Sequence, residues 1–219
     1  ERQDDFAVER YKRAIKALED GSFNDEIVKV EVPQRKGDPI IVSEDEDIRK
    51  IKFEKVPTLR PAFKKDGTVT AANASSLNDG AAAVVLMSEE KAKELGLEPL
   101  ARIVAQASAA KAPEWFTTAP ADAVNKALQK AALTVDDIDL FEINEAFSVV
   151  SLVNNDLLKL DPAKVNVHGG AVSMGHPIGA SGTRVLVTLL YAMKHADKKR
   201  GVASLCIGGG EASALVVER

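Results

Sequence analysis

Apolar and polar positions in the first third of the chain predict one long helix and one strand, followed by a loop. Residues 4–19 repeat apolar side chains at helical spacing, and those expected on one face are Phe6, Tyr11, Ile15 and Leu18. Residues 27–32 alternate as a strand does. Residues 34–61 are charged, irregular and interrupted by prolines, which predicts a long loop, and long ordered loops tend to be functional.

The remainder of the chain alternates between strand and helix patterns. Residues 81–87 are predicted to form a buried strand, and Ser88 is predicted to cap a short helix over 89–95. Further strands are expected over 100–107, 139–143, 201–207 and 212–217, and further helices over 119–132, from about 144 to 158, and from 182 to 193. This alternation predicts an α/β layered domain.

Composition excludes several classes of protein and leaves others open. The net charge of −4 and the pI near 5.5 do not suggest a nucleic-acid partner, and no apolar run is long enough for a membrane span. The single cysteine favours a reducing compartment. With neither a secretion signal nor a C-terminal peroxisomal tripeptide, we expect cytoplasm or mitochondrial matrix, and the missing initiator Met suggests that the beginning lies elsewhere.

Three segments combine a reactive or polar side chain with small residues. Asn144-Glu-Ala-Phe147 stands at a strand-to-helix junction, where Asn144 either caps the helix or points its amide at a substrate. His176 lies in the glycine-rich segment 169–182. This segment does not match the pattern of a phosphate-binding loop, and His176 is a candidate for a base. Cys206 precedes Gly208-Gly-Gly210, whose N–H groups are candidates to bind an oxyanion, although a buried cysteine is more often inert.

The order NEAF, GHPIGASG, CIGGG resembles the thiolase family, specifically acetyl-CoA C-acetyltransferases, and the blocks at 60–63 and 73–80 extend the resemblance over the whole chain. It implies that His176 activates a nucleophilic thiol and that Cys206 is the acid/base for the α-carbon of acetyl-CoA. Asn144 would hold a water of one oxyanion hole, and the Gly208 N–H would contribute to the second. The residues implied to bind coenzyme A are Lys50 (with Arg49 as the competing assignment), Ile51, Lys52, Lys55, Ser75, Leu77, Ala146 and Phe147.

The resemblance also implies an architecture. A layered α-β-α domain with a mixed five-stranded sheet is expected over 98–219, the C-terminal part of a coenzyme A-binding loop (lid) domain over 1–76, and the last strand and helix of the N-terminal thiolase domain over 77–97. The nucleophilic cysteine of thiolases belongs to their N-terminal half, so Cys206 is not that residue. We therefore expect the chain alone to be catalytically incomplete and to need an N-terminal half, within a homodimer or homotetramer.

A potassium site is a further implication of the resemblance. Backbone carbonyls of Ala71, Ala72, Ala74 and Val172 correspond to those that hold K⁺ in a subgroup of thiolases, whereas Phe6 stands where a tyrosine is expected. Apart from coenzyme A thioesters as substrates, the resemblance implies no required cofactor.

Several functions remain open at this point. The first is condensation of two acetyl-CoA to acetoacetyl-CoA and the reverse thiolysis, in lipid and sterol-precursor metabolism. The second is a longer-chain 3-ketoacyl-CoA thiolase of β-oxidation, with the same site residues and a different acyl pocket. The third is a non-catalytic fragment that serves as an assembly module.

Overall fold

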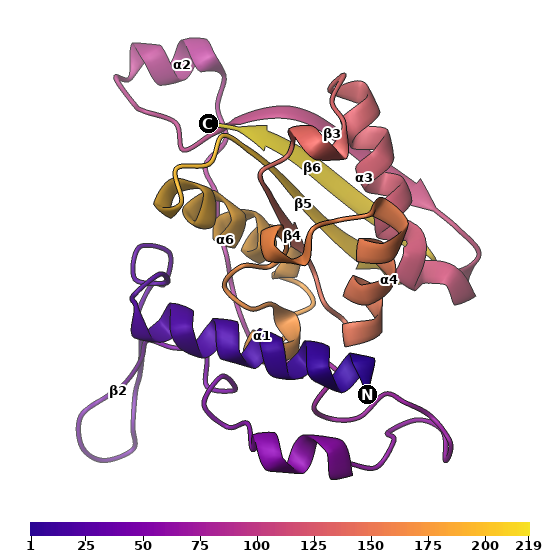
Figure 1. Cartoon of the computed structure of the whole chain (residues 1–219). Helices are drawn as coiled ribbons and strands as arrows, with labels where there is room; N and C mark the ends of the chain where they lie inside the picture. The colour runs from indigo at the N-terminus through magenta and orange to yellow at the C-terminus, as the bar shows by residue number, and fades with distance from the viewer.

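The computed structural model describes all 219 residues and has a mixed sheet at its centre. The strand order is β3 (Arg102–Ala110), β6 (Glu211–Glu218), β5 (Arg200–Ile207), β4 (Leu140–Ile143). β4 runs parallel to β5, and the other neighbouring pairs are antiparallel. Figure 1 shows this sheet in the upper part of the molecule, with α1 (Arg2–Glu19) crossing below it.

Helices cover both faces of the sheet because successive strand residues point to opposite sides. Val202 and Val216 pack on one face against α3 (Ala119–Lys130) and the end of α4 (Ser148–Leu158). Their neighbours Ala203 and Val217 pack on the other face against α6 (Ser181–His195). This confirms the expected α-β-α layering. None of the helices is both long and apolar enough to cross a bilayer.

The sheet has four strands where five were expected. At the outer edge of β4, Val165 forms a single parallel bridge with Phe141, and the next residue, Asn166, turns into the left-handed region (φ 48°). The Asn166 side chain then takes over the ladder, because its Oδ1 accepts from the Ile143 N–H (2.8 Å) and its Nδ2 donates to the Ile143 carbonyl (2.7 Å). The Asn166 amide thus makes the hydrogen bonds to Ile143 that a fifth strand would otherwise make.

The predicted strand over 81–87 is also absent as a regular element. The segment has no assigned secondary structure, and Val85 and Leu86 are 84% and 69% exposed. No strand lies beside it, so its backbone has no ladder to join. The following helix α2 (Glu89–Glu94) forms as predicted, with the Ser88 hydroxyl accepting from the Lys91 N–H.

The long charged loop contains short elements that the sequence did not suggest. β2 (Ile40–Val42) pairs with β1 (Val30–Val32) in an antiparallel ribbon, and residues Phe53–Thr58 form a 3₁₀ helix. Inside the glycine-rich segment, α5 (Ala171–Met174) forms one turn.

The buried face of α1 differs from the predicted one. Its fully buried residues are Ala7, Arg10, Tyr11, Ala14 and Ala17, while Phe6, Ile15 and Leu18 are only half-buried. Small side chains are needed because the glycine-rich segment approaches closely: a Cβ placed on Gly169 would lie 2.8 Å from that of Ala14. The helix therefore docks through alanines, with Arg10 at the centre of its contact.

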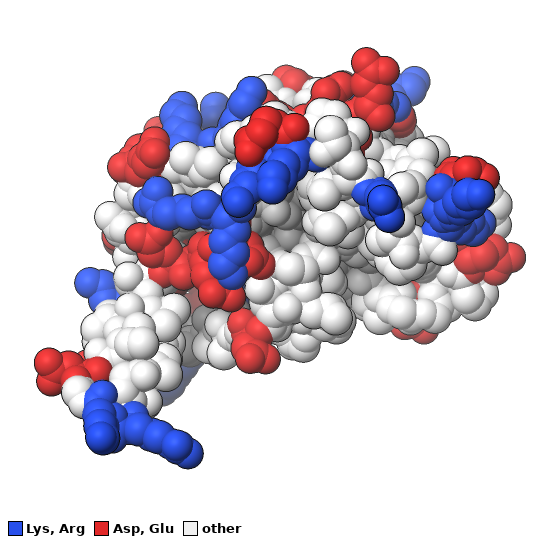
Figure 2. All heavy atoms as spheres, turned by 90° about the horizontal axis from the view of Figure 1, so that it is seen from below, with Lys and Arg blue, Asp and Glu red and all other residues white.

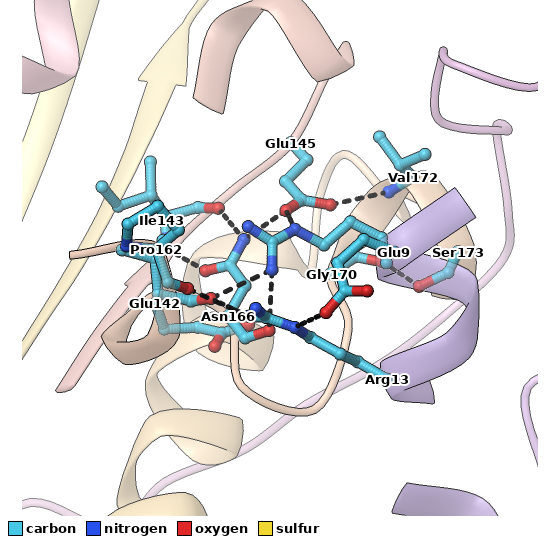
Figure 3. A network of polar contacts seen from close by, with 12 residues as sticks. Glu9, Arg13, Glu142, Ile143, Glu145, Pro162, Asn166, Gly170, Val172 and Ser173 are labelled. Carbon is cyan, nitrogen blue, oxygen red and sulfur yellow. Dashed lines mark hydrogen bonds and ion pairs between the residues drawn. The ribbon is translucent and has the colours of Figure 1, made fainter. Parts of the chain in front are cut away.

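Arg10 forms a buried ion pair with Glu145, the residue after Asn144. Their side chains are 1% and 0% exposed, and Arg10 Nε lies 2.9 Å from Glu145 Oε1. Figure 3 shows this network, in which Asn166 Nδ2 donates to the same oxygen (2.6 Å) and the Val172 N–H donates to Oε2 (3.3 Å). The pair joins α1, the end of β4 and the glycine-rich segment, which gives Glu145 a structural role.

Replacing Arg10 with Met should destabilise the fold by about 3–5 kcal/mol, because it leaves a buried carboxylate without its partner. Burial raises the pKa of Glu145, so acid should protonate the orphaned carboxyl. The loss should therefore be smaller near pH 5 than near pH 8. Urea unfolding followed by circular dichroism measures both effects.

The matched control is Arg2→Met. Arg2 also pairs with a carboxylate, Asp156, at 2.7 Å, but both side chains are exposed. Exposed pairs contribute about 0–1 kcal/mol, so equal losses in the two variants would contradict the role given to Arg10.

Candidate active site

Asn144 and Cys206 lie at the same end of the sheet, where β4 and β5 both finish, because the two strands run parallel. We call this end of the sheet the reactive edge. The Asn144 N–H donates to the Ser204 carbonyl (2.9 Å), which places the amide side chain two residues from Cys206 along the neighbouring strand. Asn144 is fully buried, and its Oδ1 has no hydrogen-bond partner. An unpaired amide oxygen that is itself buried is one that a bound water would satisfy.

His176 is brought to this edge by the segment Ser76–Gly80, which we call the strap. The His176 N–H donates to the Ser76 carbonyl (2.9 Å) and approaches Asn78 Oδ1 (3.2 Å), and Leu77 pairs with His176 as an isolated parallel bridge. Gly175 has a φ of 90°, and a Cβ there would collide with the Asn78 amide. The glycine before His176 is thus required by the closeness of the strap.

The imidazole of His176 is held at both nitrogens. Nδ1 lies 2.6 Å from Ser181 Oγ, and this hydroxyl donates to the Pro177 carbonyl (3.0 Å). Ser181 has only one hydrogen to donate, so we assign the proton to His176 Nδ1. Nε2 then carries the lone pair and accepts a long hydrogen bond from Asn144 Nδ2 (3.3 Å). The histidine therefore presents a base beside Asn144.

Burial sets the protonation of both reactive groups. It lowers the pKa of His176, with the Arg184 charge acting in the same direction, and it raises the pKa of the Cys206 thiol. At neutral pH the imidazole is neutral and the thiol keeps its proton. No hydrogen bond joins Cys206 to His176; the structure relates them only through the shared edge that carries Asn144.

Gly208 opens the turn between β5 and β6. Its N–H donates no hydrogen bond within the chain, and the residue is exposed. The turn is anchored further along, where the Lys111 N–H donates to the Gly210 carbonyl (2.9 Å). A Cβ on Gly210 would collide with the Lys111 carbonyl oxygen. The free N–H of Gly208 fits the predicted role of oxyanion donor, which stays a prediction.

A cleft of about 330 Å³ is lined by the loop that carries Lys50, Lys52 and Lys55 and by the segment that carries Ala71, Ala72 and Ala74. The predicted coenzyme A residues that line it are Lys50, Ile51, Lys52 and Lys55. Lys50 rather than Arg49 faces the cleft, since Arg49 pairs with Glu44 (3.0 Å) elsewhere. Ammonium groups beside small side chains suit phosphates followed by a slim arm.

The other predicted coenzyme A residues lie between this cleft and His176. The Ala146 carbonyl accepts from both the N–H (3.1 Å) and the hydroxyl (3.0 Å) of Ser75, and Phe147 forms an antiparallel bridge with Ala74. Leu77 is exposed and pairs with His176. Ser76 connects the two regions, because it lines the cleft and accepts from the His176 N–H.

The predicted potassium residues are only partly brought together. Ala71, Ala72 and Ala74 line the cleft, and their carbonyls accept no hydrogen bond within the chain. Val172 packs against Tyr11, which lines the same cleft. Phe6 has no oxygen to offer, and its ring lies under the Arg10 guanidinium, 4.2 Å from the centroid. Unpaired carbonyl oxygens are a kind of ligand that hard cations take, and the potassium site stays a prediction.

Sequence reasoning missed four residues of this region. Tyr11 and Ser76 line the cleft, Asp47 accepts from the strap, and Ser181 orients His176. Ser181 stands five residues after His176, and a hydroxyl near a candidate base was a usable signal. The contacts of Asp47 depend on a loop conformation that no local pattern predicts.

Comparisons with known proteins identify the family. The N-terminal domain model of thiolase matches residues 1–90, and the C-terminal domain model matches residues 97–219. The "Probable acetyl-CoA acetyltransferase" of Dictyostelium discoideum is 55% identical over 219 residues, which is 100% of this chain and 53% of that protein.

Two solved structures share the fold over nearly the whole chain. The acetyl-CoA acetyltransferase of Bacillus anthracis has a TM-score of 0.96 at 48% identity, covering 99% of this chain and 55% of that one. The Acat5 thiolase of Ascaris suum in complex with coenzyme A has a TM-score of 0.93 at 48% identity, covering 100% and 55%. The chain thus spans about half the length of its relatives, and it belongs to the thiolase family of acyltransferases.

Proposed function

We propose that this chain is the C-terminal half of an acetyl-CoA C-acetyltransferase. The reaction is Claisen condensation of two acetyl-CoA to acetoacetyl-CoA and coenzyme A, and its reversal by thiolysis. One observation carries the proposal: His176 presents a neutral Nε2 beside Asn144, at the sheet edge that Cys206 also occupies. A base, an amide and a thiol at one edge suit acyl transfer followed by deprotonation of a carbon acid.

Two half-reactions follow from these groups. In the first, His176 Nε2 takes the proton of a nucleophilic thiol, the thiolate attacks acetyl-CoA, and coenzyme A leaves with that proton. In the second, the Cys206 thiol first gives its proton to the neutral His176, and the resulting Cys206 thiolate takes the α-proton of another acetyl-CoA. The enolate attacks the acetylated thiol, which leaves as the thiolate, and acetoacetyl-CoA is formed. The thiolate of the nucleophile then takes the proton back from His176, which restores all three groups. Asn144 with a water, and the Gly208 N–H, would stabilise the two thioester oxyanions.

Coenzyme A recognition is proposed for the cleft. Lys50, Lys52 and Lys55 supply positive charge, and Ala71, Ala72 and Ala74 leave room for the pantetheine arm. The relative from Ascaris suum is described in complex with coenzyme A, which supports this class of ligand. K⁺ remains a prediction for the carbonyls of Ala71, Ala72, Ala74 and Val172, where it would hold the wall of the cleft in place.

The nucleophilic thiol is proposed to come from an N-terminal half. The chain covers 53–56% of its similar relatives, and its only cysteine is Cys206. The exposed apolar segment 81–87 is a surface that such a half would cover. We propose assembly as a homodimer or homotetramer, with the product serving lipid and sterol-precursor synthesis.

The function is tested by thiolysis of 3-ketoacyl-CoA substrates of increasing length. The chain by itself should be inactive, and the protein with its N-terminal half should cleave acetoacetyl-CoA at least about tenfold faster than long-chain substrates, which is the discrimination that a few methylenes in a pocket provide. Preference for long chains would support the β-oxidation thiolase instead. Absence of any thiolysis in the complete protein would leave only an assembly role.

Cys206→Ala should separate the two half-reactions. Exchange of the α-protons of acetyl-CoA with solvent should fall by about 10²–10⁴-fold, the usual contribution of a general base. Acetylation of the nucleophile should persist, because it uses His176. Deuterium exchange followed by mass spectrometry and trapping of the acyl-enzyme measure the two steps; normal exchange in this variant would refute the role of Cys206.

Ser181→Ala should lower kcat by about ten- to a hundredfold, because the imidazole can then adopt the wrong tautomer and turn away from Asn144. The KM for coenzyme A should stay unchanged, since Ser181 does not line the cleft. Ser181→Thr keeps the hydroxyl and should recover much of kcat. Steady-state thiolysis gives both constants, and equal rates for the Ala and Thr variants would argue against tautomer control.

A further inference from the structure

We propose that Asp47 is a positioning residue that couples the cleft to His176 through the strap. The inference rests on the proposed function, because it assigns the cleft to coenzyme A and the base to His176. Asp47 belongs to the loop before the basic residues and lines the cleft with Lys50. Its carboxylate also reaches the strap, so it touches both regions.

The carboxylate of Asp47 divides its two oxygens between these regions. Oδ2 accepts from the Ser76 hydroxyl (2.6 Å) and from Asn78 Nδ2 (3.1 Å), while Oδ1 accepts from Lys50 Nζ (3.1 Å). The Ser76 hydrogen bond, the largest cause, lowers the pKa of Asp47. The group is therefore ionised at neutral pH and accepts strongly from both strap donors.

The other side of the strap holds the His176 backbone. The Ser76 carbonyl and Asn78 Oδ1 both face the His176 N–H. A Cβ on Gly80 would lie 2.7 Å from that of Pro177, so the strap continues in close contact beyond the histidine. The strap has no regular secondary structure of its own. Its position therefore depends on Asp47 on one side and on the His176 loop on the other.

The sign of the charge argues against a role in ligand binding. A carboxylate in a cleft proposed for phosphates repels them, and its pairing with Lys50 competes with the phosphate. Figure 2 shows that acidic and basic side chains are interspersed on the face seen from below. Glu46 pairs with Lys50 as well (3.2 Å). Asp47 differs from Glu46 because it also accepts from the strap.

This difference provides a matched control. If Asp47 only neutralised Lys50, then Asp47→Ala, Asp47→Asn and Glu46→Gln would act alike, each lowering the KM for coenzyme A slightly. If Asp47 positions His176, removal of the acceptor must lower kcat as well. An amide oxygen at position 47 can still accept from Ser76 and Asn78, so the Asn variant should retain most of kcat.

The experiment measures thiolysis of acetoacetyl-CoA by the full-length protein. Asp47→Ala should lower kcat about ten- to a hundredfold, the cost of a misplaced catalytic group, with a KM for coenzyme A that is equal or up to about twofold lower, as for an exposed charge pair. Asp47→Asn and Glu46→Gln should keep kcat within about twofold of the unmodified protein. Ser76→Ala, which removes one donor to Asp47, should lower kcat by less than Asp47→Ala.

A second measurement does not require activity. Hydrogen exchange of the His176 amide reports on its bonds to the strap, so Asp47→Ala should speed that exchange about tenfold or more, and Glu46→Gln should not. Unchanged kcat together with unchanged exchange in Asp47→Ala would overturn the inference, as would equal effects of Asp47→Ala and Glu46→Gln. If the unmodified protein lacks thiolysis, the proposed function fails, and the exchange data alone still decide whether Asp47 holds the strap.

Discussion

The buried ion pair between Arg10 and Glu145 is the constraint on which the arrangement of the chain depends. Burying either charge alone would cost several kcal/mol, so α1 must dock where the guanidinium meets the carboxylate. The same carboxylate accepts from Asn166 and from the Val172 N–H, which brings the sheet edge and the glycine-rich segment to one point. Gly170 has to be a glycine there, because any Cβ would overlap the Glu145 carboxylate.

The site follows from this constraint through covalent neighbours. Glu145 follows Asn144 directly, so the groups that hold Glu145 also fix the Asn144 amide. The glycine-rich segment continues to His176, whose backbone is held by the strap and whose ring is held by Ser181. The Asn144 amide and the His176 imidazole are thus oriented by polar contacts rather than by apolar packing alone.

The cleft and the reactive edge are joined at Ser76, which belongs to both. Through Ser76, the charged loop that lines the cleft is connected to His176 at the end of the sheet. The exposed segment around Val85 and Leu86 is a surface that the proposed N-terminal half would cover.

Local sequence patterns determined the helices and most strands. Period-2 and period-3.6 patterns predicted the layers around β5, β6, α3 and α6, since a buried element must repeat its apolar face. The blocks around Asn144, His176 and Cys206 indicated the family, and Ser88 predicted the N-terminal cap of α2. These features depend on residues near one another in the chain.

Only the tertiary structure decided the features that rest on distant partners. A local pattern describes Arg10 as a solvated charge on an amphipathic helix, because its partner Glu145 is far away in sequence. The segment 81–87 has the pattern of a buried strand but lacks a neighbour to pair with, and Asn166 ends the sheet with its side chain. Pairing and burial are properties of two surfaces, whereas a local pattern describes only one of them.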